Sequence, residues 1–357
     1  MKFNFVYVKN DVYRKNDISK AQVEVSTSAL ENANEEDCRS LLDMLRANAK
    51  DIDEKKFGSI SSFNFNRNVF YKGRWNELSK IARGLFIDTS TGHIAARGFD
   101  KFFNYCEGQF NTDAWLKGNL KFPATAYKKY NGFLGILGFD KSTKSFLFCS
   151  KSCIEGTYPT YFKDIFYELK KDEDESYFTS LANHMIESDS CLLFEVIDPK
   201  NDPHIVKYDR EDLVLLDEVK LTQKFSHSSY EELCDAGKKF GFKVKEKIGV
   251  FNDWDELKSL IDEMQIYSRN CNEEGCVIED AVGYHFKMKL GWYKFWKEMR
   301  RYMQKIAKGQ VVSTSGLQTP LMNKVFAWMK AKPREWYQGK SIIDVRDEFE
   351  KEMKNGQ

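Results

Sequence analysis

Lysines beside predicted β-strands are the residues of this sequence with the clearest capacity for chemistry. Residues 126–139 read A-Y-K-K-Y-N-G-F-L-G-I-L-G-F and place Lys128 and Lys129 just before an Asn131-Gly132 pair. Asn-Gly favours a β-hairpin turn because both residues tolerate positive φ, so we predict a hairpin here. Alternation along the preceding strand sends the two lysines to opposite faces, and only one of them can then enter a pocket. Taken alone, the segment is more often a solvent-exposed hairpin with a solubilising lysine.

Charged residues in other predicted strands change that balance. Lys287 and Lys289 alternate in Y-H-F-K-M-K and share one strand face, where they repel each other unless an anion or carboxylates lie between them. An exposed amphipathic strand is the alternative for this segment alone. Glu195 lies within the apolar run C-L-L-F-E-V-I-D, and a buried carboxylate needs a cation or hydrogen-bond donors as partners. Glu274 supplies a second carboxylate at the start of G-C-V-I-E-D.

Together these residues suit a nucleoside triphosphate. Cations bind phosphates, carboxylates hold Mg²⁺, and one amine can attack phosphorus. Neighbouring lysines and a bound cation would lower the pKa of that amine, and a deprotonated lysine is a competent nucleophile. The charged residues on or beside predicted strands are Lys129, Lys151, Lys287, Lys289, Arg83, Glu195 and Glu274.

The order of these motifs resembles that of the covalent nucleotidyltransferases, the superfamily of ligases and capping enzymes. K-x-[DN]-G, S-K, F-E-x-[IV], E-G-x-V and K-x-K follow one another along the chain. The segments A-R-G-L-F-I, D-K-F-F-N, F-E-V-I-D-P-K-N and H-F-K-M-K-L-G-W-Y are similar to the bacteriophage RNA ligase 1 family, and also to the adenylyltransferase domain of fungal tRNA ligases. The resemblance covers residues 60–297. One short motif is weak evidence, whereas five in the right order are specific.

The resemblance implies a role for each matched residue. Lys129 would attack ATP and form a lysyl-AMP, and Glu274 would help to hold Mg²⁺, with Mn²⁺ as the alternative. Lys287 and Lys289 would contact the phosphates and align the α-phosphate, while Glu195 would contact the nucleoside or orient a cation. Further contacts to the nucleotide, or to an RNA 5′-phosphate, are expected from Arg83, Lys101, Lys128, Gly132 and Lys151, and Phe103 could stack on a base.

One position departs from the family pattern. The motif usually has Asp where this chain has Asn131, which removes a negative charge beside the nucleophile. The fungal tRNA ligases share this Asn, so we expect the site to be functional. Gly339-Lys340-Ser341 resembles the end of a P-loop, but Arg334 stands where that motif needs its first glycine. An end-healing kinase or phosphatase would therefore be a separate protein.

The order of predicted helices and strands indicates an α+β fold of antiparallel sheets, because short turns join most of the strands. The resemblance implies that these sheets form an adenylyltransferase domain with an N-terminal extension at residues 1–297. A small all-helical domain is expected at 298–357. Helices are predicted at residues 28–50, 158–171 and 177–187 and in two segments that Ser229 and Asp253 cap. Strands are predicted at residues 84–88, 93–97, 124–130, 133–139, 145–150, 191–198, 205–209, 213–217, 275–280 and 284–289.

Composition limits the other possibilities. The 357 residues carry a net charge of +1, are 42% hydrophobic and contain eight scattered cysteines without a C-x-x-C pair. These values predict a soluble, cytoplasmic protein with no structural zinc, no signal peptide and no membrane partner. Any RNA must then bind to a local basic patch. The basic segment 287–305 is the candidate, with its aromatic residues in the core and its lysines and arginines on RNA.

We therefore predict an ATP-dependent RNA ligase that joins 5′-phosphate and 3′-hydroxyl ends, as in RNA or tRNA repair. A second possibility is an enzyme that also forms a lysyl-nucleotide but transfers the nucleotide to an acceptor other than an RNA 5′-phosphate end, as a capping enzyme, a DNA ligase or a protein AMP transferase does. Capping enzymes and full DNA ligases generally carry a C-terminal β-barrel, and the helical pattern of this C-terminal region argues against both. A third is an inactive RNA-end-binding protein, which would have lost the lysine or a carboxylate.

Overall fold

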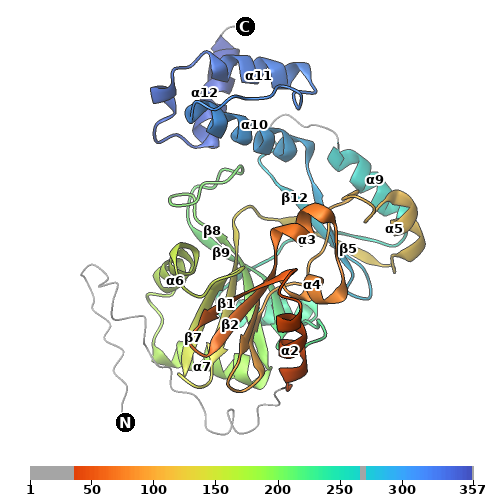
Figure 1. Ribbon diagram of the computed structural model, residues 1–357, viewed down its shortest axis with the longest axis vertical. Helices are drawn as coiled ribbons and strands as arrows, with labels where there is room; N and C mark the ends of the chain where they lie inside the picture. Colours follow the sequence, from red (N-terminus) through yellow and green to blue (C-terminus); the bar gives the residue numbers. More distant parts are fainter. Residues whose placement is uncertain (1–35, 266–270, 356–357) are drawn as a thin grey trace. The chain divides into compact units, whose positions relative to one another are not determined.

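The computed structural model describes residues 36–265 and 271–355 (Figure 1). The chain divides into two compact units. The first unit contains Met1–Phe102, Phe133–Val196 and Asp212–Lys245, and the second contains Phe103–Gly132, Ile197–Glu211 and Glu246–Gln357. Part of the predicted helix at 28–50 lies outside the described residues, and α2 covers Arg39–Ala47 of the remainder. The division of roles between residues 1–297 and 298–357 remains a prediction.

The first unit is built on two β-sheets. One has the order β1-β2-β3-β4 and is antiparallel throughout. The other has the order β10-β9-β8-β6-β7, in which β10 pairs with β9 in parallel and β6 pairs with β7 and β8 antiparallel. Their strands are β1 (Ile52–Phe57), β2 (Ile60–Phe65), β3 (Leu85–Asp88), β4 (His93–Arg97), β6 (Phe133–Asp140), β7 (Ser145–Ser150), β8 (Ser190–Ile197), β9 (Asp212–Lys220) and β10 (Lys243–Val244).

Two hydrophobic cores cover the two faces of the larger sheet. Residues of β8 are buried along its whole length, because Phe194 faces a core with helices α6 and α7 while Leu193 faces a core shared with the smaller sheet. Glu195 follows the alternation of Leu193 and so points to the side of the smaller sheet. The helices of this unit are α2 (Arg39–Ala47), α3 (Arg67–Lys72), α4 (Glu77–Ile81), α6 (Thr157–Leu169), α7 (Glu175–Glu187) and α8 (Tyr230–Lys239).

The second unit joins a four-stranded antiparallel sheet to a group of helices. The sheet has the order β11-β5-β12-β13, and α5 and α9 pack on it through a shared core. Figure 1 shows α10, α11 and α12 together in blue, and they share another core. The elements are β5 (Ala124–Lys129), β11 (Lys247–Phe251), β12 (Gly275–Glu279), β13 (His285–Lys289), α5 (Asp113–Asn119), α9 (Trp254–Gln265), α10 (Gly291–Ala307), α11 (Pro320–Lys330), the 3₁₀ helix η2 (Arg334–Tyr337) and α12 (Ile342–Asn355).

Most predicted elements are present, with three differences. The predicted hairpin at Asn131-Gly132 is wrong: β5 and β6 belong to different sheets, and neither residue of the pair has a positive φ. The predicted strand at 205–209 is a loop. The strands β1, β2, β10 and β11 and the helices α3, α4 and α5 are absent from the predicted set; the sequence of β1, I-D-E-K-K-F, for example, has no apolar and polar alternation. Among the described residues, no helix is long and apolar enough to cross a membrane.

Candidate active site

Three strands of the second unit bring two lysines onto one buried carboxylate. Lys129 ends β5 and Lys289 ends β13, and both stand opposite Gly275 of the central strand β12. Glu274 directly precedes that glycine. Its Oε1 lies 3.1 Å from Lys129 Nζ and 2.6 Å from Lys289 Nζ. The Glu274 side chain is only 2% exposed, so this ion triad is largely shielded from water.

Burial and charge act in opposite directions within the triad. Burial favours the protonated form of Glu274, but the two lysines outweigh it and hold the pKa of this carboxyl group below its usual value. Burial lowers the pKa of Lys289; Glu274 acts against this effect, and the positive charge of Lys129 adds to it. Two ammonium groups thus share one carboxylate. For Lys289, burial and the second ammonium group both favour loss of a proton, and the shared carboxylate opposes it.

Asn131 fixes the position of the carboxylate. Its Nδ2 donates hydrogen bonds to Glu274 Oε2 at 2.7 Å and to the Tyr293 hydroxyl at 3.2 Å. Its Oδ1 accepts the backbone N–H groups of Ile205 and Val206, each at 3.0 Å. Asn131 is 4% exposed, and an ionised aspartate here could not donate to Glu274. The asparagine that departs from the family motif therefore fits its surroundings in this chain.

Lys128 and Lys287 have different surroundings from the triad. Lys128 Nζ lies 2.9 Å from Glu273 Oε1, whose side chain is half exposed, which agrees with opposite faces for Lys128 and Lys129. The backbone of Lys287 forms hydrogen bonds with Phe103 and Tyr105, and its side chain is partly buried.

Phe103 and Gly132 are two further predicted contacts that lie in the second unit. The ring of Phe103 is 5% exposed and stacks on Phe110 with a centroid distance of 4.1 Å, so the predicted base-stacking role for Phe103 does not fit this arrangement. Gly132 is the last residue of the second unit before the chain enters β6.

The remaining predicted residues lie in the first unit. Burial lowers the pKa of Arg83, and the negative charge of Glu195 acts against this effect, so Glu195 has a neighbouring cation as predicted. Burial also lowers the pKa of Lys151, and the positive charge of Arg83 lowers it further. Lys101 lies with its Nζ 5.0 Å from the centre of the Trp75 ring. Close cations that repel each other favour a bound anion.

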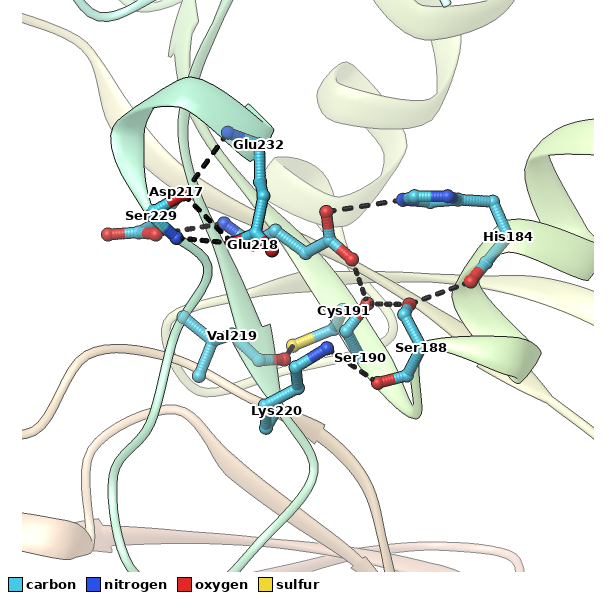
Figure 2. A network of polar contacts seen from close by, with 10 residues as sticks. All are labelled: His184, Ser188, Ser190, Cys191, Asp217, Glu218, Val219, Lys220, Ser229 and Glu232. Atoms are coloured by element: carbon cyan, nitrogen blue, oxygen red, sulfur yellow. Dashed lines mark hydrogen bonds and ion pairs between the residues drawn. The ribbon is translucent and has the colours of Figure 1, made fainter. Parts of the chain in front are cut away.

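A buried carboxylate that sequence analysis missed lies elsewhere in the first unit (Figure 2). Glu218 of β9 accepts hydrogen bonds from Ser190 at 2.7 Å and from the His184 ring at 3.2 Å. Burial opposes ionisation, but these contacts hold the pKa of Glu218 at about 2. Ser188 links Ser190 to the backbone of His184, and Lys220 donates to the carbonyl of Ser188. Strands β8 and β9 and helix α7 are thus tied together by a network that a pattern of residue types does not reveal.

Comparison with known proteins identifies the family. A family model described as RNA ligase matches residues 81–293, which is more than half of the chain. The chain belongs to the RNA ligase family. No curated protein sequence matches this RNA ligase.

Solved ligase structures are similar to this chain to different degrees. An archaeal ATP-dependent RNA ligase superposes with a TM-score of 0.52 at 14% identity, over 86% of this chain and 73% of that one. A putative ATP-dependent DNA ligase from Aquifex aeolicus gives a TM-score of 0.49 at 16% identity, over 88% and 80% of the two chains. A mutant of Naegleria gruberi RNA ligase with ATP and Mn gives 0.41 at 13% identity, over 51% and 53%. The first of these confirms the predicted α+β nucleotidyltransferase fold.

Proposed function

We propose that this RNA ligase is ATP-dependent and works through a covalent lysyl-AMP on Lys129. In the first step, Lys129 Nζ attacks the α-phosphorus of ATP, a P–N bond forms and pyrophosphate leaves. In the second, an RNA 5′-phosphate attacks the same phosphorus, which frees the lysine and gives an RNA-adenylate. In the third, an RNA 3′-hydroxyl attacks the activated phosphate, a phosphodiester forms and AMP leaves.

The observation that carries this proposal is the buried triad of Lys129, Lys289 and Glu274. An amine must be unprotonated to attack, and the ammonium group of Lys289 beside Lys129 favours loss of a proton by charge repulsion. Glu274 holds Lys129 at the end of a strand, so little conformational freedom is lost at the moment of reaction. Lys289 remains as a cation able to neutralise charge on the phosphates.

The family pattern places Glu274 near a divalent ion that also binds phosphate oxygens of ATP. Mg²⁺ usually takes one or two protein carboxylates beside the substrate phosphates, and a carboxylate oxygen suits Mn²⁺ as well. Such an ion would supply positive charge to the departing pyrophosphate. The family pattern further expects Lys287 on the phosphates, and Arg83, Lys101, Lys151 and Glu195 on the nucleotide or the RNA 5′-phosphate.

Helix α10 offers a cationic surface for the RNA backbone. Its apolar face is buried, which agrees with the core role predicted for its aromatic residues. Its other face lines a hollow of about 300 Å³. Lys297 is close enough to Lys289 to lower the pKa of that residue by charge repulsion, so the surface continues to the triad. The lining residues are Lys289, Lys294, Lys297, Glu298, Arg300, Arg301 and Gln304.

The biological setting we propose is RNA repair, with tRNA as one substrate and a separate enzyme to heal the ends. We also propose a reducing, cytoplasmic compartment, since all eight cysteines are free thiols.

The test is label transfer from ATP labelled at the α-phosphate, with Mg²⁺ or Mn²⁺ and without RNA. We expect label that survives denaturation on the wild-type protein and on Lys128→Ala, and none on Lys129→Ala. Lys128→Ala is the matched control because it removes the neighbouring lysine of the same strand. Folded protein that takes no label with either metal would refute the proposal and favour an inactive RNA-end-binding protein. Labelled protein that passes AMP to nicked DNA or to protein, and not to RNA, would indicate a different acceptor.

A further inference from the structure

Two adjacent aromatic side chains of α3 are unusually exposed in the first unit. Phe70 is 51% exposed and Tyr71 is 79% exposed, and their ring centroids lie 5.5 Å apart. Large aromatic side chains usually bury most of their surface, because each one removes much apolar area from water. The exposure is not due to poor helix formation, since Asn66 caps α3 through hydrogen bonds to Asn68 N and Val69 N. A folded, capped helix therefore presents two rings to solvent.

The exposed rings continue inward as a series of ring contacts. Phe70 lies 6.5 Å from Trp75, and Trp75 lies 4.8 Å from Phe65, in edge-to-face geometry. The series ends on two lysines: Lys101 Nζ is 5.0 Å from the centre of the Trp75 ring, and Lys151 Nζ is 5.4 Å from that of Phe65. These are the two lysines of this unit that the family pattern places on the nucleotide or on the RNA 5′-phosphate. The exposed rings are thus connected to residues expected to hold phosphate.

Basic residues flank the two rings along the chain. The segment R-N-V-F-Y-K-G-R-W, residues 67–75, has three basic residues and no acidic one. Arg67, Lys72 and Arg74 are all exposed, and only Arg74 has a short ion pair, to Asp51 at 2.7 Å. Exposed rings between cations are the combination by which proteins hold single-stranded nucleic acid, since the bases stack on the rings and the backbone lies against the charges. A purely apolar protein partner would gain nothing from the flanking cations.

We propose that α3 is a stacking platform for single-stranded RNA, with bases on Phe70 and Tyr71 and the backbone along Arg67 and Lys72. The inference rests on the proposed function, because it concerns the RNA substrate of the same enzyme. The lysines at the inner end of the ring series place the 5′-phosphate end of the strand there. Base stacking depends little on sequence, so the platform contributes affinity for unpaired RNA rather than a choice among bases.

The experiment measures RNA affinity and lysyl-AMP formation separately. Fluorescence anisotropy with a 5′-phosphorylated single-stranded RNA is compared for the wild-type protein, Phe70→Ala, Tyr71→Ala and Tyr71→Phe. The control is Tyr158→Ala, which removes another exposed aromatic side chain of the first unit, 45% exposed in α6. Label transfer from ATP without RNA, and urea unfolding, are recorded for every variant.

We expect each alanine variant to bind RNA about 5- to 150-fold more weakly, which corresponds to the loss of one stacked base. Tyr71→Phe and Tyr158→Ala should bind as the wild type does, and all variants should form lysyl-AMP normally. RNA affinity that is unchanged in both alanine variants would overturn the inference and favour a protein partner on this surface. Weaker binding that accompanies an equal loss of lysyl-AMP or of folding would also overturn it. A wild-type protein that binds RNA but takes no label would refute the proposed function instead.

Discussion

Exchange of one buried atom at Asn131 tests the proposed role of its amide. Asn131→Asp keeps the shape of the side chain, and its Oδ1 can still accept the N–H groups of Ile205 and Val206. The change replaces the Nδ2 donor, 2.7 Å from Glu274 Oε2, with an oxygen. Two ionised carboxylates at this separation repel each other by several kcal/mol, even at the effective dielectric constant of about 20 that suits protein sites.

The introduced carboxylate and Glu274 can avoid this repulsion if one of the two binds a proton, and the cost of that protonation sets the size of the effect. Holding a carboxyl group of ordinary pKa protonated costs about 3.5 kcal/mol at pH 7 and about 1 kcal/mol at pH 5. The folded variant binds a proton that the unfolded chain has lost, so its stability falls as the pH rises. We expect the loss of unfolding free energy to grow by about 2.5 kcal/mol between pH 5 and pH 7. Lys129 and Lys289 offset part of the repulsion, so this value is an upper bound.

The assay is urea unfolding of wild type and variant at both pH values. Asn323→Asp is the control, because Asn323 is exposed in the same unit and its amide donates to the carbonyl of Thr319. The control should lose little stability and show no such pH dependence. A difference between Asn131→Asp and wild type that is equal at pH 5 and pH 7 would refute the argument that the amide serves to donate to Glu274.

Three further predictions concern other parts of the chain. Glu218→Gln should lose about 3 kcal/mol of unfolding free energy at pH 7, because the pKa of Glu218 is lowered from 4.5 to about 2. This stabilisation is complete above pH 4.5 and is lost toward pH 2. Urea unfolding that shows a constant difference between wild type and variant over that pH range would contradict the prediction. Gly275→Ala should lower the free energy of unfolding by about 2 kcal/mol or more and weaken lysyl-AMP formation, because φ is +145° and a Cβ would lie 2.0 Å from the carbonyl oxygen of Met288. Hydrogen exchange should show faster opening of β12 and β13. Unchanged protection of these strands would count against the prediction. Lys294→Glu with Lys297→Glu should raise the KM for RNA about tenfold and reduce the salt dependence of RNA binding. An unchanged KM would show that α10 does not bind the RNA.

Local patterns sufficed for the residues that lie on regular strands. Alternation in β13 correctly placed Phe286 and Met288 in the core, with Lys287 and Lys289 on the other face. The cost of burying a charge correctly predicted a cation near Glu195. The aromatic spacing of α10 likewise predicted its buried face. In each case the period of the element and the burial of one face decide where a side chain points, and both can be read from nearby residues.

Local patterns failed where a long-range contact outweighed a local preference. Asn131-Gly132 has the composition of a hairpin turn, but Asn131 uses both ends of its amide for partners that are distant in the chain. Hydrogen bonds to a buried carboxylate and to two buried N–H groups stabilise an extended connection more than a tight turn would. The same applies to residues 205–209, which look like a strand but form the loop that donates those N–H groups.

The sequence by itself determined the family, the fold class and the set of chemical groups, because these depend on residue types and their order along strands. Only the tertiary structure decided how the groups are combined. Lys129, Glu274 and Lys289 meet because β12 pairs with both β5 and β13, and no residue type specifies that pairing. The same pairing brings Asn131 to the carboxylate and so gives the amide its function. Contacts between distant segments depend on the packing of the whole unit, and they decide which of several lysines lies against a buried carboxylate.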